Sequence, residues 1–224
     1  MIQSMGRRLR VVFNRTETDD VDPASIALGA HHLALPVLDF VAYAEDCVLF
    51  GRVRLAAERL TDMLNEHDEV LLIDVMAERL DGGGAIEVKE VLVKRDEILL
   101  VHATGPRGSV SRRQRTRQHP IAVVLGPYEV RGYLHALPGA DPLASLRRRK
   151  PMVPLTEAWI EYAIGAVRQR RRVGAVVINR EQIDVITHAL DEEIELPDMP
   201  IGAEQGPLVK DFTGSILIPD PGTA

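Results

Sequence analysis

The chain of 224 residues contains a single cysteine, Cys47, which excludes an intrachain disulfide. This cysteine lies among hydrophobic residues in the segment DCVLF, so we expect a buried structural thiol. No hydrophobic run approaches the roughly 20 residues that a membrane-spanning helix needs. The basic segment at the start, MIQSMGRRLRVVFNRTE, has too short a hydrophobic part for a signal peptide. We therefore expect a soluble, cytoplasmic protein with no membrane partner.

Patterns that carry catalysis or cofactor binding are also missing. The chain has no Gly-x-Ser-x-Gly motif, and the glycines at 82–84 lack the Lys-Ser/Thr pair that completes a phosphate-binding loop. The seven histidines do not gather as a metal site would require, and the adjacent His31 and His32 point apart in a strand or a helix. The sequence thus predicts no catalytic residue, no metal and no cofactor. We expect a non-enzymatic protein, with an enzyme of unknown type as an alternative.

Charge is unevenly distributed along the chain, although the net charge is only −6. Residues 1–105 carry 11 basic and 19 acidic side chains, residues 106–180 carry 15 and 4, and residues 181–224 carry 1 and 10. Segregation of this kind bears on association rather than on fold. The basic block has two possible partners: nucleic acid, or the acidic blocks of this chain or of a neighbouring copy.

A strand–turn–strand pattern occurs twice, in 91-VLVKRDEILLV-101 and in 176-VVINREQIDVI-186. We interpret each as a hairpin. The two turns lie 85 residues apart, from Arg95 to Arg180. The segments before them also correspond: a strand pair, a polar insert with helical spacing (Leu60, Met63 and Leu64; then Leu143 and Leu146), and another strand. The same order of elements in two units indicates an internal duplication.

The duplication gives five predicted segments. They are an N-terminal extension (1–40), unit 1 (41–103), a basic linker (104–119), unit 2 (120–189) and an acidic, Pro- and Gly-rich tail (190–224). Each unit has about five short strands and no crossover helix, so the strands must be antiparallel and the sheet must close or cover its edges. Glycine permits the necessary bend, and Gly51 and Gly132 occupy the middle of the second strand of each unit. The predicted fold is mainly β: two small, strongly bent, five-stranded antiparallel barrels in tandem.

These units resemble Sm-like domains. The first motif of that family, apolar–x–apolar, a turn, then apolar–x–Gly–x–apolar, is similar to 41-VAYAEDCVLFGRV-53 and to 123-VVLGPYEVRGYL-134. The acidic third strand of the family resembles LIDVMAE at 72–78 and LTEAWIE at 155–161. The resemblance implies ring assembly in which the last strands of one barrel pair with a neighbour. We therefore expect a homo-oligomer, with three chains closing a ring of six barrels.

The resemblance also marks pocket-like positions, because two loops of Sm-like domains form a uracil-binding site. The matching residues here are Asp62, Asn65, Lys94, Arg95, Asn179 and Arg180. The glycine of the family's Arg-Gly pair is replaced by arginine in both units, and unit 2 has no equivalent of the Asp-x-x-Met-Asn loop. These departures argue against a base pocket of the family type, most strongly in unit 2.

Basic runs are the candidate nucleic-acid-binding residues. They are Arg112, Arg113, Arg115 and Arg117 in the linker; Arg147, Arg148, Arg149 and Lys150 in the insert of unit 2; and Arg168, Arg170, Arg171 and Arg172 in the last loop of unit 2. RNA binding through these side chains is one hypothesis. Aromatic residues make up only 4% of the chain and none interleaves with the runs, so the stacking surface typical of single-strand binders is missing. We therefore favour a self-assembling structural scaffold over an RNA-binding protein.

The acidic tail contains one hydrophobic island, 212-FTGSILIP. A hydrophobic strand on a tether is typical of segments that add to a sheet edge. We predict that Phe212, Ile216, Leu217 and Ile218 dock on a barrel of the same chain or of a neighbour; a plain extended end is the alternative.

Overall fold

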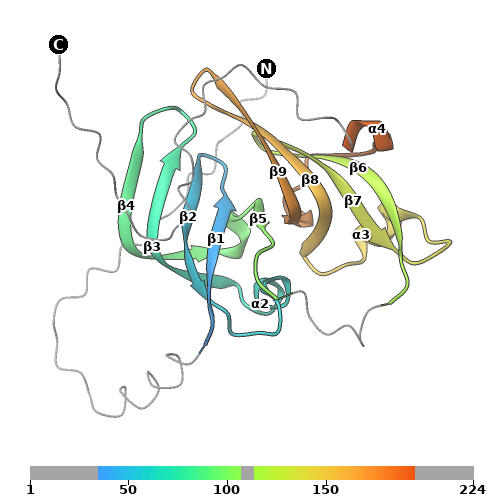
Figure 1. Ribbon diagram of the computed structural model, residues 1–224, viewed down its shortest axis with the longest axis horizontal. Coiled ribbons are helices and arrows are strands. Elements are labelled where there is room, and N and C mark those ends of the chain that lie inside the picture. Colours follow the sequence, from blue (N-terminus) through green and yellow to red (C-terminus); the bar gives the residue numbers. More distant parts are fainter. Residues whose placement is uncertain (1–34, 107–113, 195–224) are drawn as a thin grey trace.

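The computed structural model describes residues 35–106 and 114–194, and these fold mainly as antiparallel β-structure (Figure 1). The extension before residue 35, residues 107–113 and the tail after residue 194 lie outside the described residues. The predicted docking residues Phe212, Ile216, Leu217 and Ile218, together with Arg112 and Arg113, therefore lie outside them too.

The first half of the structure corresponds to unit 1. Its elements are β1 (Val37–Tyr43), β2 (Cys47–Arg54), α2 (Leu60–Glu66), β3 (Glu69–Arg79), β4 (Ala85–Lys94), a 3₁₀ turn (Arg95–Glu97) and β5 (Leu100–His102). The second half repeats this order. Its elements are β6 (Arg117–Leu125), β7 (Tyr128–Ala136), α3 (Pro142–Arg147), β8 (Met152–Ile164), β9 (Val167–Asn179), a 3₁₀ turn (Arg180–Gln182), β10 (Val185–His188) and α4 (Asp191–Ile194).

The ten strands form one continuous sheet in the order β10-β6-β7-β8-β9-β5-β1-β2-β3-β4. Each half contributes five neighbouring strands in equivalent order, and the two halves meet where β5 pairs with β9. The hydrogen-bonded ladder does not close into a barrel: it ends at β4 on one side and at β10 on the other. β4 is the outermost labelled strand at the left of Figure 1.

Both predicted bends lie at the predicted glycines. The β2–β3 register shifts between Phe50 and Arg52, and the β7–β8 register shifts between Arg131 and Tyr133. A Cβ atom on Gly51 would lie 3.1 Å from the Val75 side chain, and one on Gly132 would lie 3.0 Å from Ala158 Cβ. The facing strands carry a matching irregularity, because Asp74 and Glu157 have left-handed φ values of 52° and 51°. Two bulges of the same construction support the duplication seen in the sequence.

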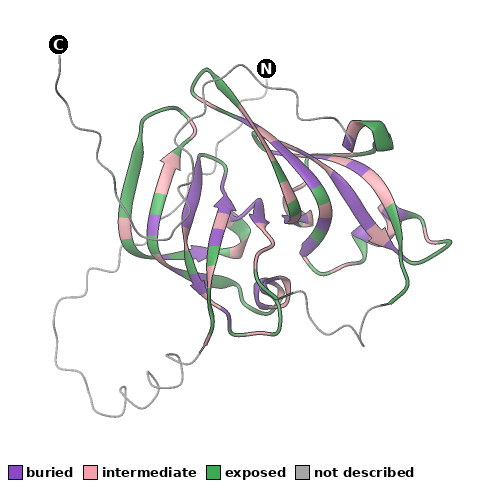
Figure 2. Ribbon diagram, in the orientation of Figure 1, coloured by how far each residue is buried: buried purple, intermediate pink, exposed green. Residues whose placement is uncertain are grey.

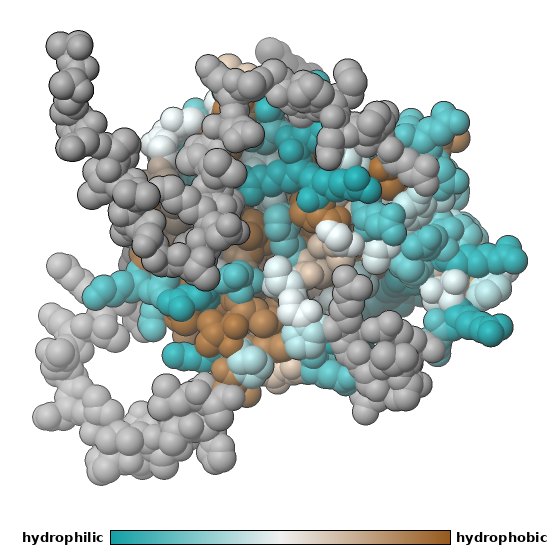
Figure 3. Space-filling view, viewed as in Figure 1, coloured by the Kyte–Doolittle hydropathy of each residue, from teal (hydrophilic) through white to brown (hydrophobic). Residues whose placement is uncertain are grey.

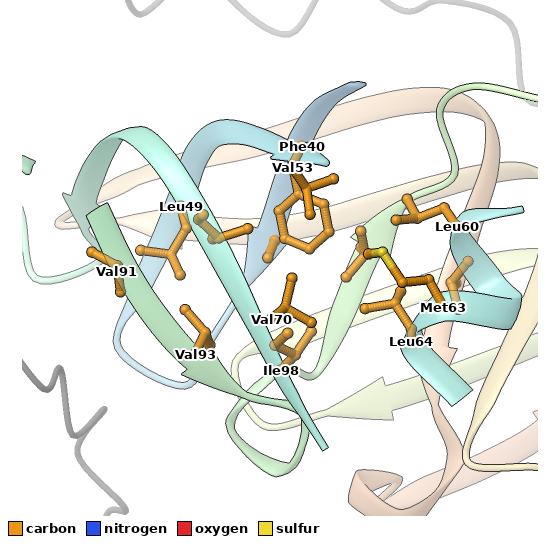
Figure 4. Packing of buried hydrophobic residues seen from close by; sticks show 14 of the residues in the cluster. Phe40, Leu49, Val53, Leu60, Met63, Leu64, Val70, Val91, Val93 and Ile98 are labelled. Atoms are coloured by element: carbon orange, nitrogen blue, oxygen red, sulfur yellow. The ribbon is translucent and has the colours of Figure 1, made fainter. Parts of the chain in front are cut away.

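The predicted helical inserts are present and bury the predicted faces. Leu60, Met63 and Leu64 of α2 are all buried in the core of the first half (Figure 4). Figure 2 shows the same helix with buried and intermediate residues. Leu146 of α3 is buried in the core of the second half, where Asp141 caps the helix by accepting hydrogen bonds from the amides of residues 143 and 144. Cys47 is buried, as its hydrophobic neighbours predict.

The prediction of two hairpins around Arg95 and Arg180 is wrong. β4 pairs with β3, and β5 pairs with β1 and β9, so the strands on either side of the first turn do not pair with each other. β9 and β10 diverge in the same way. The reason is that each turn is a 3₁₀ helix rather than a two-residue reversal, and it carries the chain across the fold to another partner.

Replacing Gly132 by alanine should destabilise the fold by about 1–3 kcal/mol, because the added methyl group would be forced against Ala158 at the bulge. The matched control is Gly174→Ala in β9, two strands away in the sheet, where a Cβ atom would meet nothing within 4 Å. That change should be neutral or stabilising by up to about 1 kcal/mol. Urea unfolding of both variants tests this; equal effects would contradict the close approach at Gly132.

Candidate functional site

The junction between β5 and β9 is the best-defined site in the described part of the chain. Leu100, Val101 and His102 lie opposite Ile178, Val177 and Val176, respectively. The amide of Asn179 donates to the carbonyl of Leu99 over 2.8 Å, and the amide of Ala103 donates to that of Ala175 over 3.0 Å. The strand residues at the centre of this junction are fully buried. The three-residue strand β5 and the end of β9 therefore join the halves through a buried, hydrogen-bonded seam.

Asn179 fixes this seam from the unit 2 side. Its side chain is 1% exposed, and it is the one buried polar residue among those described. Its amide nitrogen donates to the carbonyls of Arg95 and Ile98 in unit 1, and its amide oxygen accepts from the backbone of Glu181. The Ile98 carbonyl thus receives a donor from unit 2, and the Arg95 carbonyl, which already accepts from the backbone amide of Ile98 within the 3₁₀ turn, receives a second one. Loss of that side chain would remove the donor to the Ile98 carbonyl, and a buried polar group left unpaired costs about 1–3 kcal/mol.

An aromatic cluster closes one end of the junction. The rings of Tyr43, Tyr128 and Tyr162 pack with centroids 5.2–5.6 Å apart, with edge-to-face or tilted geometry. The Tyr128 hydroxyl donates to the carbonyl of Ala44 over 2.6 Å, across the junction. A hydrogen bond of 2.8 Å joins the Tyr43 hydroxyl to His102 Nε2. Burial raises the pKa values of Tyr43 and Tyr128, and so both phenols stay protonated.

The insert helix α2 forms a second clamp between the halves. Asn65 donates to the carbonyl of Met152 over 2.9 Å and accepts from the amide of the same residue over 3.0 Å. Met152 is the first residue of β8, so the end of α2 is held at the start of that strand. Nearby, Arg180 donates to the carbonyl of Arg149, and Arg95 pairs with Asp68 at 2.9 Å.

Several of the six pocket-like positions are therefore occupied by contacts of the junction. Asn65, Arg95 and Asn179 hold the two halves together, Arg180 binds the backbone before β8, Asp62 pairs with Arg59, and Lys94 is exposed. The sequence marked these positions but not their use, because the hydrogen bonds of the Asn65, Asn179 and Arg180 side chains across the fold are with backbone groups far away in the chain. The one local signal of this use is that a polar residue directly precedes each turn, Lys94 in unit 1 and Asn179 in unit 2.

The described basic candidates lie on separate elements, at the start of β6, around α3 and on β9. Arg115 and Arg117 are exposed at the start of β6, and Arg147, Arg148 and Lys150 are exposed around the end of α3. Arg149 is half-buried and donates to the carbonyl of His135. In Figure 3, hydrophilic side chains dominate the right-hand side of the molecule, over the second half, and hydrophobic residues show near the middle.

The prediction that Arg168 and Arg170–Arg172 lie in a loop is wrong, because they belong to strand β9, where the run divides between the two faces of the sheet. Arg170 and Arg172 lie over the Trp159 ring, with guanidinium carbons 4.3 and 5.5 Å from its centroid. Arg171 points the other way, toward Phe50 and Tyr162. Successive side chains in a strand point to opposite faces, so a run of three cannot make one patch. The Arg170 side chain is only 16% exposed and pairs with Glu161, whereas that of Arg168 is 83% exposed.

The two outer strands are edges equivalent to those used at the junction. Ile73 and Thr156 are equivalent, because each directly precedes a residue with a left-handed φ, Asp74 and Glu157. Glu90 of β4 pairs with Ile73, and Ala175 of β9 pairs with Thr156. Residues 91–93 of β4 are therefore equivalent to residues 176–178 of β9. Likewise Ile186 of β10 faces Val123 as Val101 of β5 faces Ala42. Both edges expose hydrophobic side chains: Ile86 and Leu92 on β4 are 53% and 39% exposed, and Val185 on β10 is 52% exposed.

Within residues 35–106 and 114–194, no group of three or more His, Cys, Asp or Glu side chains is placed to hold a metal ion. Burial raises the pKa of Cys47 to about 12, so this thiol is protonated and is a poor nucleophile. Among the described helices, none has the length and hydrophobicity to cross a membrane.

The stability of the junction should depend on pH through His102. Burial, together with the nearby Arg171, lowers the pKa of His102 from 6.5 to about 4. The unfolded chain therefore takes up a proton below about pH 6.5 that the folded chain excludes until about pH 4, so stability is lost as pH falls through this window. Between pH 7 and pH 5, the wild type should lose about 2 kcal/mol more than His102→Gln. Urea unfolding at both pH values measures this difference; parallel losses in the two proteins would show that His102 does not titrate in this way.

Comparison of the chain with protein-family models, with curated proteins and with solved structures finds no match.

Proposed function

We propose that this protein is a non-enzymatic scaffold whose copies join head to tail, with β10 of one copy pairing with β4 of the next. One observation carries the proposal: the outer strands β4 and β10 are the repeat equivalents of β9 and β5, which pair inside the chain. An unpaired edge strand is a ready template for another strand. Each chain carries one open edge equivalent to β9, which is β4, and one equivalent to β5, which is β10.

The internal junction also gives the register between copies. Ile186 of one copy takes the place of Val101, and Leu92 of the next takes the place of Val177, so these two residues lie opposite each other. In the same register Val185 lies opposite Val93, and Thr187 opposite Val91. The exposed side chains of Leu92 and Val185 would then become buried, which favours association by the hydrophobic effect.

A head-to-tail contact uses two different surfaces, so it produces a ring when the rotation closes and a filament when it does not. The resemblance to Sm-like domains supports a ring, and in this interpretation each half is a strongly bent barrel of the Sm-like type. With two units in each chain, three chains would make a ring of six units. The bulges at Gly51 and Gly132 bend both halves in the same way, and repeated bending in one direction favours closure.

RNA binding is the alternative function. In its favour are the exposed side chains of Arg115, Arg117, Arg147, Arg148, Lys150 and Arg168. Against it, these side chains belong to separate elements, and Arg170 and Arg171 are engaged with aromatic rings. The scaffold accounts for more of the described features.

Proline variants of the two edges test the assembly. In the internal junction, Asn179 and Ala103 donate across the seam, so the intervening pair Val101–Val177 also exchanges hydrogen bonds across it. By equivalence, the N–H groups of Ile186 and Leu92 point outward, and proline there removes a donor from the open edge alone. Wild-type protein should be oligomeric, while Leu92→Pro and Ile186→Pro should each be monomeric by light scattering.

Mixing the two proline variants distinguishes head-to-tail pairing from other contacts. The Leu92→Pro chain keeps a working β10 and the Ile186→Pro chain keeps a working β4, so the mixture should form a 1:1 heterodimer and nothing larger. Leu92→Val and Ile186→Val, which keep the N–H groups, should assemble like the wild type. A monomeric wild type at tens of micromolar would overturn the scaffold proposal, and so would self-association of either proline variant alone.

A fluorescent single-stranded RNA should show no binding at ~50 mM salt if the scaffold is the whole function. Binding that weakens steeply with salt, with a log–log slope of about −0.7 per phosphate contacted, would favour the RNA alternative. Arg168→Gln removes a charge on a side chain that is 83% exposed and lies 4.0 Å from Glu161, and Arg170→Gln removes one held against Trp159, so the two make an informative pair. Only the first should weaken such binding without lowering the melting temperature.

A further inference from the structure

The internal junction is more than a strand pair, since α2 also reaches across it. The last turn of α2 places Asn65 against both backbone groups of Met152, at the start of β8. A junction between copies that repeats this geometry must bring α3 of one copy against the start of β3 in the next. The residues that meet there follow from the repeat, and they differ from those inside the chain.

The repeat assigns Arg147 to the position of Asn65. Leu64 of α2 and Leu146 of α3 are both buried core residues near the end of the helix, and Asn65 and Arg147 directly follow them. On the other side, Glu69 takes the position of Met152. Each is the first residue of its strand, and each pairs with the last residue of the next strand, Lys94 for Glu69 and Asn179 for Met152.

The chemistry of these positions is complementary. Arg147 and Arg148 are exposed cations, and Glu69 and Asp68 are exposed carboxylates. Asp68 also pairs with Arg95, whereas Arg147, Arg148 and Glu69 take part in none of the ion pairs found among the described residues. Lys94, at the position of Asn179, would supply a donor toward the 3₁₀ turn of the neighbouring copy, as Asn179 does inside the chain.

The net charges of the two halves are complementary in the same direction as these residues. Residues 35–106 carry 7 basic and 15 acidic side chains, while residues 114–194 carry 12 and 9. Head-to-tail joining brings a basic half against an acidic half at every junction. The competing contact, β4 against β4, would bring two acidic halves together. Charge complementarity of this kind acts mainly on partner choice and association rate.

We propose that Arg147 and Arg148 at the end of α3 bind Glu69 and Asp68 at the start of β3 in the next copy, and that these ion pairs select the head-to-tail contact. This proposal rests on the proposed scaffold function, because it needs β10 and β4 to pair between copies. Its partner is a second copy of this chain.

The heterodimer of the two proline variants isolates one such contact. In it, the Leu92→Pro chain supplies α3 and the Ile186→Pro chain supplies Glu69. Adding Arg147→Glu to the first chain should raise the dissociation constant about tenfold at 50 mM salt. Adding Glu69→Arg to the second chain should do the same. The two reversals together should restore the dissociation constant to within about threefold of the starting value, because the charges attract again.

Salt and a matched reversal serve as controls. The effects of both single reversals should shrink at 0.5 M salt, because exposed charges are screened there. Arg117→Glu, an exposed reversal of equal charge at the start of β6, should leave the dissociation constant unchanged. The melting temperature of each chain shows whether the variant is folded. Recovery of binding in the double reversal also requires that both reversed chains are folded.

The possible failures are distinct. If the proline variants form no heterodimer, the scaffold function itself is wrong. If the heterodimer forms but Arg147→Glu has no effect, or weakens it without recovery by Glu69→Arg, the scaffold stands and the proposed ion pairs are wrong.

Discussion

The pairing of β5 with β9 is the constraint on which the rest of the structure depends. β5 contains only three residues, yet it joins two five-stranded halves into one sheet. Each core also includes residues from the other half: Met152 and Val177 pack in the first core, and Tyr43, Val48 and Phe50 pack in the second. Neither half can bury its own hydrophobic side chains fully without the other. The halves are therefore best regarded as one cooperative unit made from two copies of a motif.

Much of this architecture could be predicted from local sequence. The bends at Gly51 and Gly132 and the buried face of α2 follow from short local patterns, and the duplication follows from the recurrence of such patterns in the two halves. The predicted hairpins failed because a turn of charged residues between two apolar runs does not show whether the strands it joins will pair. That choice was decided by β1 and β9, which lie far away in the sequence.

The candidate site was less predictable for the same reason. Asn179 and Asn65 act on backbone groups 81 to 87 residues away, and no local pattern reports such a partner. The arginines of β9 looked like a single basic run, but strand alternation sends them to two faces, where Trp159, Phe50 and Tyr162 meet them. Aromatic residues that are sparse and scattered in the sequence thus become concentrated around the junction.

Covalent linkage of two units through one chain has a consequence for the response to dilution. The β5–β9 seam forms between segments held at a high effective concentration, so it persists however dilute the protein becomes. A seam between β10 and β4 of separate copies would have no such protection and would obey mass action. In any closed ring of these chains, permanent seams within chains would alternate with reversible seams between chains. Such an assembly would come apart into whole chains, each a preformed pair of units ready to be reused.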